Sequence, residues 1–341
     1  FFTSDEADWK VPDPADYEIR NNYFYKDDKY IYGNPRSDGR YYDNRHFLEL
    51  KRGRRYLIDG NIFDGNFGTL QQGLAVNFSN NGGYAPTDNV PEGISDITVT
   101  NNIFTRNPMA IGVNGHLFGR WGLATEPVQR VNLTNNLIVD NVGRYANPGW
   151  GASRDGAPAA GFQLGNGAED ITVKHNTLYG STWAILVLDQ TAPDLRPSAN
   201  LVFQDNVSVF GIGFSGQGSA GLTALEAAWK RIPNRGWAVD HNVLIGPFDQ
   251  IGLNKISDNP AGNFYVDSET QVGFVDSANR QLALSSSSPY KGRASDGADP
   301  GVDWAKLVAA TKDTKTGKST APFNPPERKL APPPPQGLRV D

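Results

Sequence analysis

The chain has 341 residues, contains no cysteine and carries a formal net charge of −5 at pH 7. Without cysteine it has no disulfide framework, no thiolate metal site and no cysteine nucleophile. The mild acidity argues against a surface built to bind a nucleic-acid backbone, and no apolar run is long enough to span a membrane. Aromatic residues make up 11% of the chain, so we expect a folded protein with one large core or two domains.

The first residues, Phe1-Phe2-Thr3, include no Met and are followed by no basic or apolar leader segment. They are typical of a mature or trimmed chain from which a signal peptide has been removed. We therefore expect an extracellular protein, and we expect it to be monomeric.

One short pattern recurs along most of the chain: an apolar residue, two variable residues, Asn, one more residue and an apolar or small residue. The instances are IRNNYF (19–24), IDGNIF (58–63), VTNNIF (99–104), LTNNLI (133–138), VKHNTL (173–178), FQDNVS (203–208) and VDHNVL (239–244). Their fixed asparagines are Asn22, Asn61, Asn102, Asn136, Asn176, Asn206 and Asn242. A second apolar strand follows most of them, as LAVNF (74–78), MAIGV (109–113), GFQL (161–164), WAILVL (183–188) and GIGF (211–214). The chain contains 30 asparagines, and the recurrence of seven of them at the same position of the repeat needs a structural reason.

Alternation of apolar and polar residues with period two predicts short β-strands. A single such unit cannot bury its apolar face, but stacked units share a continuous core. The long spacing between equivalent strands excludes tight hairpins and predicts parallel pairing. Asn tolerates the left-handed backbone region and bonds nearby backbone, so we place it at a sharp turn, where stacked amides can form a ladder. We therefore predict an all-β, right-handed parallel β-helix of about seven or more rungs; a β-propeller is the main alternative.

A rung needs fewer residues than the repeat spacing provides, so we predict insertions. They fall at 79–93, 116–129, 143–160, 189–199 and 215–236, and the last contains a predicted short helix at 223–232. Loops on one side of a solenoid often carry function. From 311 onward Lys, Thr and Pro dominate. We therefore expect a β-helix domain over 1–310 and a Pro/Thr/Lys-rich tail over 311–341, which either frays or links to a further module.

The Asn-turn repeats resemble the right-handed parallel β-helix proteins of the pectate-lyase-like superfamily. The segments HFLELKRGRRYLIDGNIFDGN (46–66) and GNFYVDSETQVGF (262–274) onward to 303 are similar to a secreted bacterial group of uncharacterised function, so that the resemblance covers roughly 17–310. It implies a carbohydrate-active protein. Where some relatives carry an Arg after the strand equivalent to LAVNF, this chain has SNNGG (79–83), which puts a site carried by that Arg in doubt.

Glycan cleavage requires particular groups, which we sought along the chain. Hydrolysis needs two carboxylates about 5–10 Å apart, whereas β-elimination needs a base and often calcium. The predicted outward positions of the second strands, including Asn114 and Gln163, are small and neutral, and we find no acidic cluster typical of a calcium site. Glu49 and Lys51 share one strand face, as an acid/base pair or as a structural ion pair. His46 is ambiguous, whereas His175 and His241 precede turn asparagines and are interpreted as structural.

Two insertions from adjacent rungs combine the side chains that a glycan site requires. The first insertion holds His116, Arg120, Trp121 and Glu126, and the second holds Arg144, Tyr145, Trp150, Arg154 and Asp155. We interpret them as opposing walls of one groove, with His116 or Arg120 as base or charge stabiliser and Glu126 or Asp155 as acid. Trp121 and Trp150 would be the sugar platforms. A loop whose Trp only covers the core edge is the alternative for the first insertion.

The sequence thus favours an extracellular enzyme that cleaves a polysaccharide, with hydrolysis slightly preferred over elimination. It would need no cofactor, and Ca²⁺ only if it is a lyase. The alternative is a β-helix that binds glycans or serves as a surface structure without catalysis.

Overall fold

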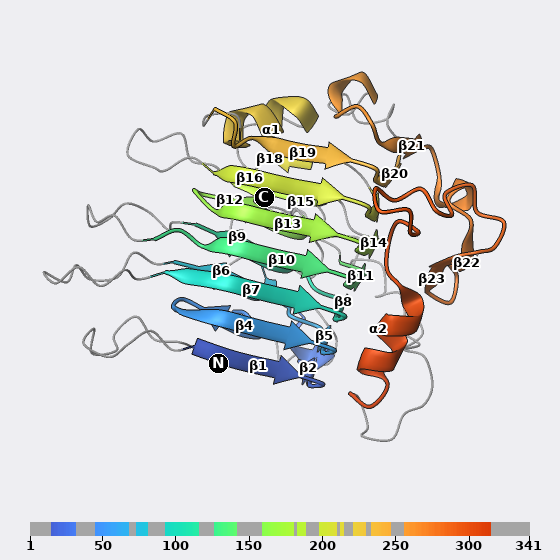
Figure 1. Ribbon diagram of the computed structural model, residues 1–341. Coiled ribbons are helices and arrows are strands. Elements are labelled where there is room, and N and C mark those ends of the chain that lie inside the picture. Colours follow the sequence, from blue (N-terminus) through green and yellow to red (C-terminus); the bar gives the residue numbers. More distant parts are fainter. Residues whose placement is uncertain are drawn as a thin grey trace, which may run out of the picture.

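The computed structural model describes residues 15–31, 45–67, 73–80, 93–115, 126–141, 159–180, 183–188, 198–209, 212–214, 221–229, 233–246 and 256–314. In these residues the chain forms stacked rungs of parallel strands (Figure 1). Each full rung contributes one strand to each of three sheets, which we call A, B and C. Sheet B contains seven of the described strands, sheet C eight and sheet A six. The predicted parallel β-helix of about seven rungs is therefore confirmed, while its right-handed sense stays a prediction.

Sheet B is formed by β1 (Ala15–Arg20), β4 (Gly53–Asp59), β7 (Ile94–Thr100), β10 (Gln129–Thr134), β13 (Glu169–Lys174), β16 (Ala199–Gln204) and β19 (Trp237–Asp240). Sheet C is formed by β2 (Tyr23–Tyr25), β5 (Ile62–Asp64), β8 (Ile103–Thr105), β11 (Leu137–Val139), β14 (Thr177–Tyr179), β17 (Val207–Val209), β20 (Val243–Ile245) and β21 (Phe264–Val266). Sheet A is formed by β3 (Leu48–Leu50), β6 (Leu74–Ser79), β9 (Met109–Asn114), β12 (Ala160–Gly165), β15 (Trp183–Leu188) and β18 (Ile212–Phe214).

The other elements are the hairpin of β22 (Phe274–Asp276) and β23 (Gln281–Leu284), helices α1 (Gly221–Trp229) and α2 (Trp304–Thr311), and the 3₁₀ turns Asp28–Tyr30, Ile256–Asp258 and Glu269–Gln271. Helix α1 overlaps the predicted helix at 223–232, whose last three residues lie outside the described part. Trp229 of α1 is fully buried in the main core, and α1 contacts the last strand of sheet A. The helix therefore covers the core at the C-terminal end of the stack.

The seven repeat asparagines form a continuous amide ladder at the turn between sheets B and C. The side-chain oxygen of Asn136, for example, accepts from the backbone N–H and the side-chain amide of Asn102, both at 3.0 Å. The Asn136 amide donates in turn to the Val99 carbonyl at 2.8 Å and to the Asn176 side chain at 3.1 Å. The pattern repeats up to Asn242, which donates to Asn263 beyond the last repeat. The predicted ladder is confirmed, and it satisfies buried backbone groups that the turn would otherwise leave unpaired.

The sharp backbone turn lies one residue before the ladder asparagine. The preceding non-glycine residues have φ between 52° and 62°, and Gly60 has φ 67°. They are Asn21, Asn101, Asn135, His175, Asp205 and His241. Our prediction that the fixed Asn itself takes the left-handed conformation is therefore wrong. The fixed Asn points its amide inward along the stack instead, and its neighbour absorbs the strain of the bend.

A second left-handed column crosses sheet B and carries alternating charge. It consists of Asp16, Arg55, Asp96, Arg130, Asp170 and Asn200, with φ between 52° and 62° in this column as well. Arg55 pairs with Asp16 at 2.6 Å, Arg130 with Asp96 at 2.6 Å, and Asn200 donates to Asp170 at 2.5 Å. The hydrogen bond from Arg130 lowers the pKa of Asp96 below its usual value. These pairs of opposite charge on neighbouring rungs stabilise the observed strand register relative to a register in which the rungs are shifted.

The interior is filled by aligned side chains from the three sheets. Phe63 stacks on Phe24 and on Phe104 with ring centroids 4.8 Å apart in both pairs. Equivalent positions on adjacent rungs thus place equivalent residues in contact, because parallel strands in register lie about 4.8 Å apart.

Residues 267–314, here called the strap, follow the last strand of sheet C and cover the outer face of that sheet (Figure 1). Leu282, Val302 and Leu307 of the strap pack on apolar side chains that sheet C turns outward, such as Ile103 and Leu137. The strap then reaches the first rungs, where the Ala310 carbonyl accepts from the Asn21 side chain at 2.6 Å. Gly301 is required at one crossing, since a Cβ there would lie 2.7 Å from the Thr177 hydroxyl. The short strands of sheet C therefore have apolar contacts on both faces.

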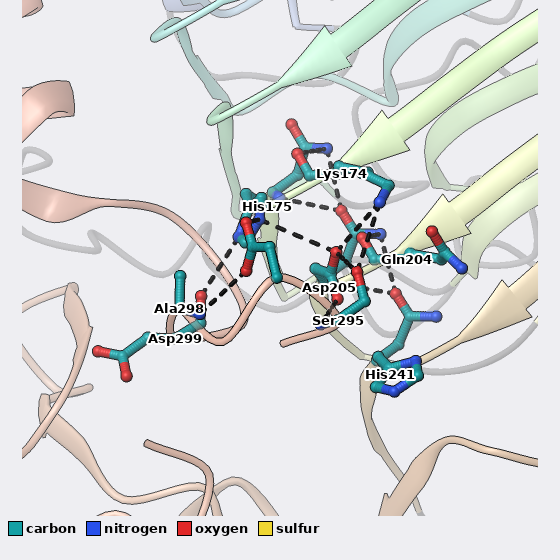
Figure 2. Close-up of polar contacts among 12 residues, drawn as sticks. Lys174, His175, Gln204, Asp205, His241, Ser295, Ala298 and Asp299 are labelled. Carbon is teal, nitrogen blue, oxygen red and sulfur yellow. Dashed lines mark hydrogen bonds and ion pairs between the residues drawn. The ribbon is translucent and has the colours of Figure 1, made fainter. Parts of the chain in front are cut away.

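Asp205 anchors the strap at its middle (Figure 2). Its buried carboxylate accepts from the Ser295 backbone N–H at 2.6 Å and from the Ser295 hydroxyl at 2.7 Å. Lys174 lies 3.4 Å from the same carboxylate. His175 bonds to the strap through Asp296 at 3.0 Å and through the Asp299 carbonyl at 3.2 Å. The turn residues before the ladder thus also hold the strap.

We predict that Asn136→Ala lowers the free energy of unfolding by at least about 2 kcal/mol, because the buried Val99 carbonyl and Asn102 N–H lose their partners. Urea denaturation measures this change. The control is Asn132→Ala on the exposed face of β10, with an expected change within about 0.5 kcal/mol. Equal stability of the two variants would contradict a supporting role for the ladder.

We predict that Asp205→Ala loosens the strap while the rungs stay folded. The amide hydrogens of Ser295 and Gly301 should exchange at least about tenfold faster, which corresponds to a loss of about 1.4 kcal/mol. Asp276→Ala is the matched control, because that carboxylate bonds to Asn279 within its own hairpin. Unchanged exchange in the Asp205 variant would mean that the other contacts hold the strap without this carboxylate.

Candidate functional site

The outer face of sheet A carries a row of polar side chains on its first rungs. Val76 and Phe78 point into the main core, so the alternation of the strand turns Asn77 to the outer face. Glu49 lies beside Asn77 on the neighbouring strand, between the core residues Leu48 and Leu50. The same row continues through Gly112, Gln163 and Leu186. This register places Glu49 at the start of the row and makes it the row's carboxylate among the described residues.

The rows on either side differ in chemistry. On one side Ser79, Asn114 and Gly165 are aligned. On the other side lie Leu74, Met109, Ala160 and Trp183, which belong to a small apolar cluster together with Leu186. The face therefore carries a polar band beside an apolar strip, and the side chains of the band are buried: Glu49, Asn77, Ser79, Asn114 and Gln163. That combination suits an amphipathic ligand such as a sugar, whose ring faces are apolar and whose edges carry hydroxyl groups.

His46 joins the polar band just before β3. Its side chain is 2% exposed, and its Nδ1 lies 2.9 Å from the Leu74 carbonyl oxygen. A carbonyl can only accept, so Nδ1 must carry the proton and Nε2 must be the acceptor in the neutral ring. Nε2 lies 3.5 Å from the Asn77 side-chain nitrogen and 4.0 Å from Glu49 Oε1. The backbone therefore fixes which ring nitrogen faces the polar band.

Glu49 combines burial with incomplete pairing. Its side chain is 4% exposed, and Oε1 lies 3.7 Å from Lys51 Nζ. Its Oε2 is buried and has no hydrogen-bond partner among the described residues. An unsatisfied buried oxygen costs about 1–3 kcal/mol, and more when it is charged. Such a cost in a small patch of polar side chains is typical of a site organised for a ligand or for chemistry.

Glycine at position 112 lets the neighbouring side chains meet. A Cβ there would lie 2.8 Å from Asn77 Oδ1 and 2.8 Å from a Leu74 methyl carbon. Without it, Asn77 lies over the Gly112 backbone and accepts a hydrogen bond of 3.0 Å from the Asn114 side chain. The missing side chain thus helps to set the orientation of the Asn77 amide.

A second, shorter asparagine ladder lies behind this band, at the turn between sheets C and A. The Asn66 and Asn107 backbone N–H groups donate to the Asn107 and Asn141 side chains at 2.8 and 3.2 Å. Lys26 donates to Asn66 at the first rung, and burial lowers the pKa of Lys26 to about 8. Asn66 also donates to the Leu74 carbonyl at 2.6 Å, so His46 and this ladder share one acceptor. The ladder therefore supports the position of His46.

Four of the residues predicted from the sequence lie together on this face. Glu49 and Lys51 form the predicted pair, and Asn114 and Gln163 occupy the predicted outward positions. Glu126 lies at a corner beyond sheet A, where its backbone oxygen accepts from Asn80 at 2.5 Å and its Oε2 from Gln129 at 3.3 Å. The remaining candidates, His116, Arg120, Trp121, Arg144, Tyr145, Trp150, Arg154 and Asp155, lie outside the described residues.

Sequence reasoning left His46 undecided and did not assign a role to Asn77. It also treated Glu49 separately from the neutral strand face. The signal was available, because Leu48-Glu49-Leu50 repeats the pattern of Val76-Asn77-Phe78. This shared pattern is hard to detect because β3 is short and lies far along the chain from the next strand of sheet A.

The described residues contain no group of three or more His, Asp or Glu side chains that could hold a metal ion. They also contain no helix long and apolar enough to cross a lipid bilayer.

Comparisons of the chain with protein-family models, with curated proteins and with solved structures found no match.

We predict that His46 is present as the Nδ1-protonated tautomer whenever its ring is neutral. Long-range ¹H–¹⁵N correlation spectra measure this directly, and the chain has only four histidines to assign. Gly112→Ala should weaken the preference, because the added methyl group displaces Asn77 from its place beside Nε2. A neutral ring protonated at Nε2 would contradict the hydrogen bond to Leu74.

Proposed function

We propose that the protein is an extracellular carbohydrate-active enzyme that cleaves glycosidic bonds of a polysaccharide on the outer face of sheet A. The observation that carries the proposal is Glu49, a buried carboxyl with one unpaired oxygen beside Lys51 and His46. The parallel solenoid supports the resemblance to the pectate-lyase-like superfamily, from which the expectation of a sugar substrate comes. The amides of Asn77, Asn114 and Gln163 offer both donors and acceptors to sugar hydroxyl groups.

Glu49 is paired with Lys51 and would act as the general base, taking a proton from the water that attacks the anomeric carbon. As the bond from the anomeric carbon to the glycosidic oxygen breaks, a second carboxyl group would give its proton to that oxygen. Canonical hydrolysis places the two carboxyl groups about 5–10 Å apart. Glu126 and Asp155, predicted from the sequence as the acid, are the candidates for the second group.

Hydrolysis is preferred here over elimination, because the described side chains of the face are amides, His46, and a carboxylate with its paired lysine. Elimination would need a cation to neutralise the uronate carboxylate in addition to a base, for which His46 would be the candidate. Lys51 lies 3.7 Å from Glu49, so its positive charge is already balanced. The alternative is a face that binds a glycan without cleaving it, which the same amide groups would also support.

We predict that Glu49→Gln lowers kcat at least about a hundredfold while the enzyme still binds its polysaccharide, because the amide has the shape of the carboxylate but cannot take up the proton of the attacking water. A polysaccharide panel should be assayed for new reducing ends and for absorbance of unsaturated uronates, with and without Ca²⁺. Glu18→Gln, on the exposed face of β1, is the matched control and should leave kcat unchanged. Binding without any cleavage by the unmodified protein would favour the non-catalytic alternative.

A further inference from the structure

A backbone carbonyl determines which groups donate and which accept along the polar band. The Leu74 carbonyl accepts from His46 Nδ1, so Nε2 of the neutral ring offers only a lone pair. The Asn77 side chain must therefore turn its NH₂ group toward His46 and its oxygen toward Asn114. The NH₂ group of Asn114 in turn donates to Asn77 Oδ1 at 3.0 Å. Each amide in the band is oriented by the one before it.

The outward end of this chain is an acceptor. Asn114 Oδ1 is buried, Asn114 itself is only 5% exposed, and the oxygen has no partner among the described residues. At the other end of the band, Glu49 Oε2 is likewise buried and has no hydrogen-bond partner among the described residues. These two acceptor oxygens both belong to side chains at least nine-tenths buried, and the third unsatisfied atom on the described part of the face is the buried Ser79 hydroxyl, which can donate or accept. A ligand that relieves both acceptor oxygens must supply hydrogen-bond donors.

The net charge of the band determines which kind of sugar it favours, a neutral one or a uronate. Glu49 is the carboxylate of the band and Lys51 lies 3.7 Å from it, so the pair has no net charge. The Leu74 carbonyl fixes a proton on Nδ1 of His46, and Asn77 and Asn114 are neutral. A uronate carboxylate would bring only acceptor oxygens toward two acceptors, whereas a neutral hydroxyl group can donate to either.

We propose that this face recognises a neutral, hydroxyl-bearing sugar chain, with hydroxyl groups donating to Glu49 Oε2 and to Asn114 Oδ1, and that it discriminates against uronate units at this position. The inference rests on the proposed function for its sugar ligand and names the substrate class. The two acceptors lie on strands two rungs apart, about 10 Å along the solenoid. Hydroxyl groups of neighbouring sugar units in one chain can therefore meet them.

The first test uses the unmodified full chain. Calorimetric titration compares neutral hexose and pentose oligosaccharides with oligouronates of the same length and at the same ionic strength. We expect at least one neutral oligosaccharide to bind at least about tenfold more tightly than any oligouronate. Tighter binding of an oligouronate, or binding of neither class, overturns the proposal.

Two variants examine the assigned atoms. Asn114→Ala should weaken binding of the neutral oligosaccharide at least about tenfold, because one acceptor is removed. Glu49→Gln leaves the Lys51 charge unbalanced and should narrow the preference for neutral over uronate ligands. Asn132→Ala on sheet B is the matched control, with unchanged affinities expected. Thermal unfolding of each variant separates lost binding from lost folding, and unchanged affinity in a folded Asn114→Ala variant contradicts the assignment.

The outcome separates this inference from the proposed function. Tight binding of a neutral oligosaccharide without cleavage supports the inference and contradicts the proposed enzyme. Cleavage of a polyuronate supports an enzyme and contradicts the inference.

Discussion

The structure depends on the amide ladder at the turn between sheets B and C. At each rung the backbone must bend sharply, and a bend buried between stacked rungs leaves N–H and carbonyl groups without water. One inward-pointing asparagine per rung bonds the backbone of its own rung and the side chain of the next, as Asn102 and Asn136 do. Because each amide needs its neighbours, the ladder is satisfied only when the rungs are stacked in register.

Register has consequences for every face of the solenoid. Aligned rungs place Phe63 between Phe24 and Phe104 in the core. On sheet B they place Arg130 beside Asp96, so a left-handed bend that would be unfavourable for a bulky residue coincides with an ion pair. On sheet A they bring Glu49 beside Asn77, although the two are far apart in the chain. The candidate site is thus a product of the same stacking that builds the core.

Much of the fold could be predicted from the sequence, because its signals are local. A period-two strand and a recurring Asn are visible within a few residues, and they gave the strands, the parallel pairing and the ladder. The exact placement of the bend was missed, since a left-handed conformation at His175 or Asp205 has no strong local signal. The strap was missed as a structural element for a different reason. Its contacts, such as Ser295 with Asp205, join residues about 90 apart in sequence, which no local pattern encodes.

The sequence by itself determined the repeat, the parallel β-helix and the identity of Glu49, Lys51, Asn114 and Gln163 as candidates. Only the tertiary structure decided that these four share one face with His46 and Asn77, and that the hydrogen bonds of the band run in one direction. The physical reason is that strand alternation is a property of each short segment, whereas register and tautomer depend on atoms supplied by other rungs. The Leu74 carbonyl that orients His46 belongs to the next strand of sheet A, and no reading of residues 46–51 alone includes it.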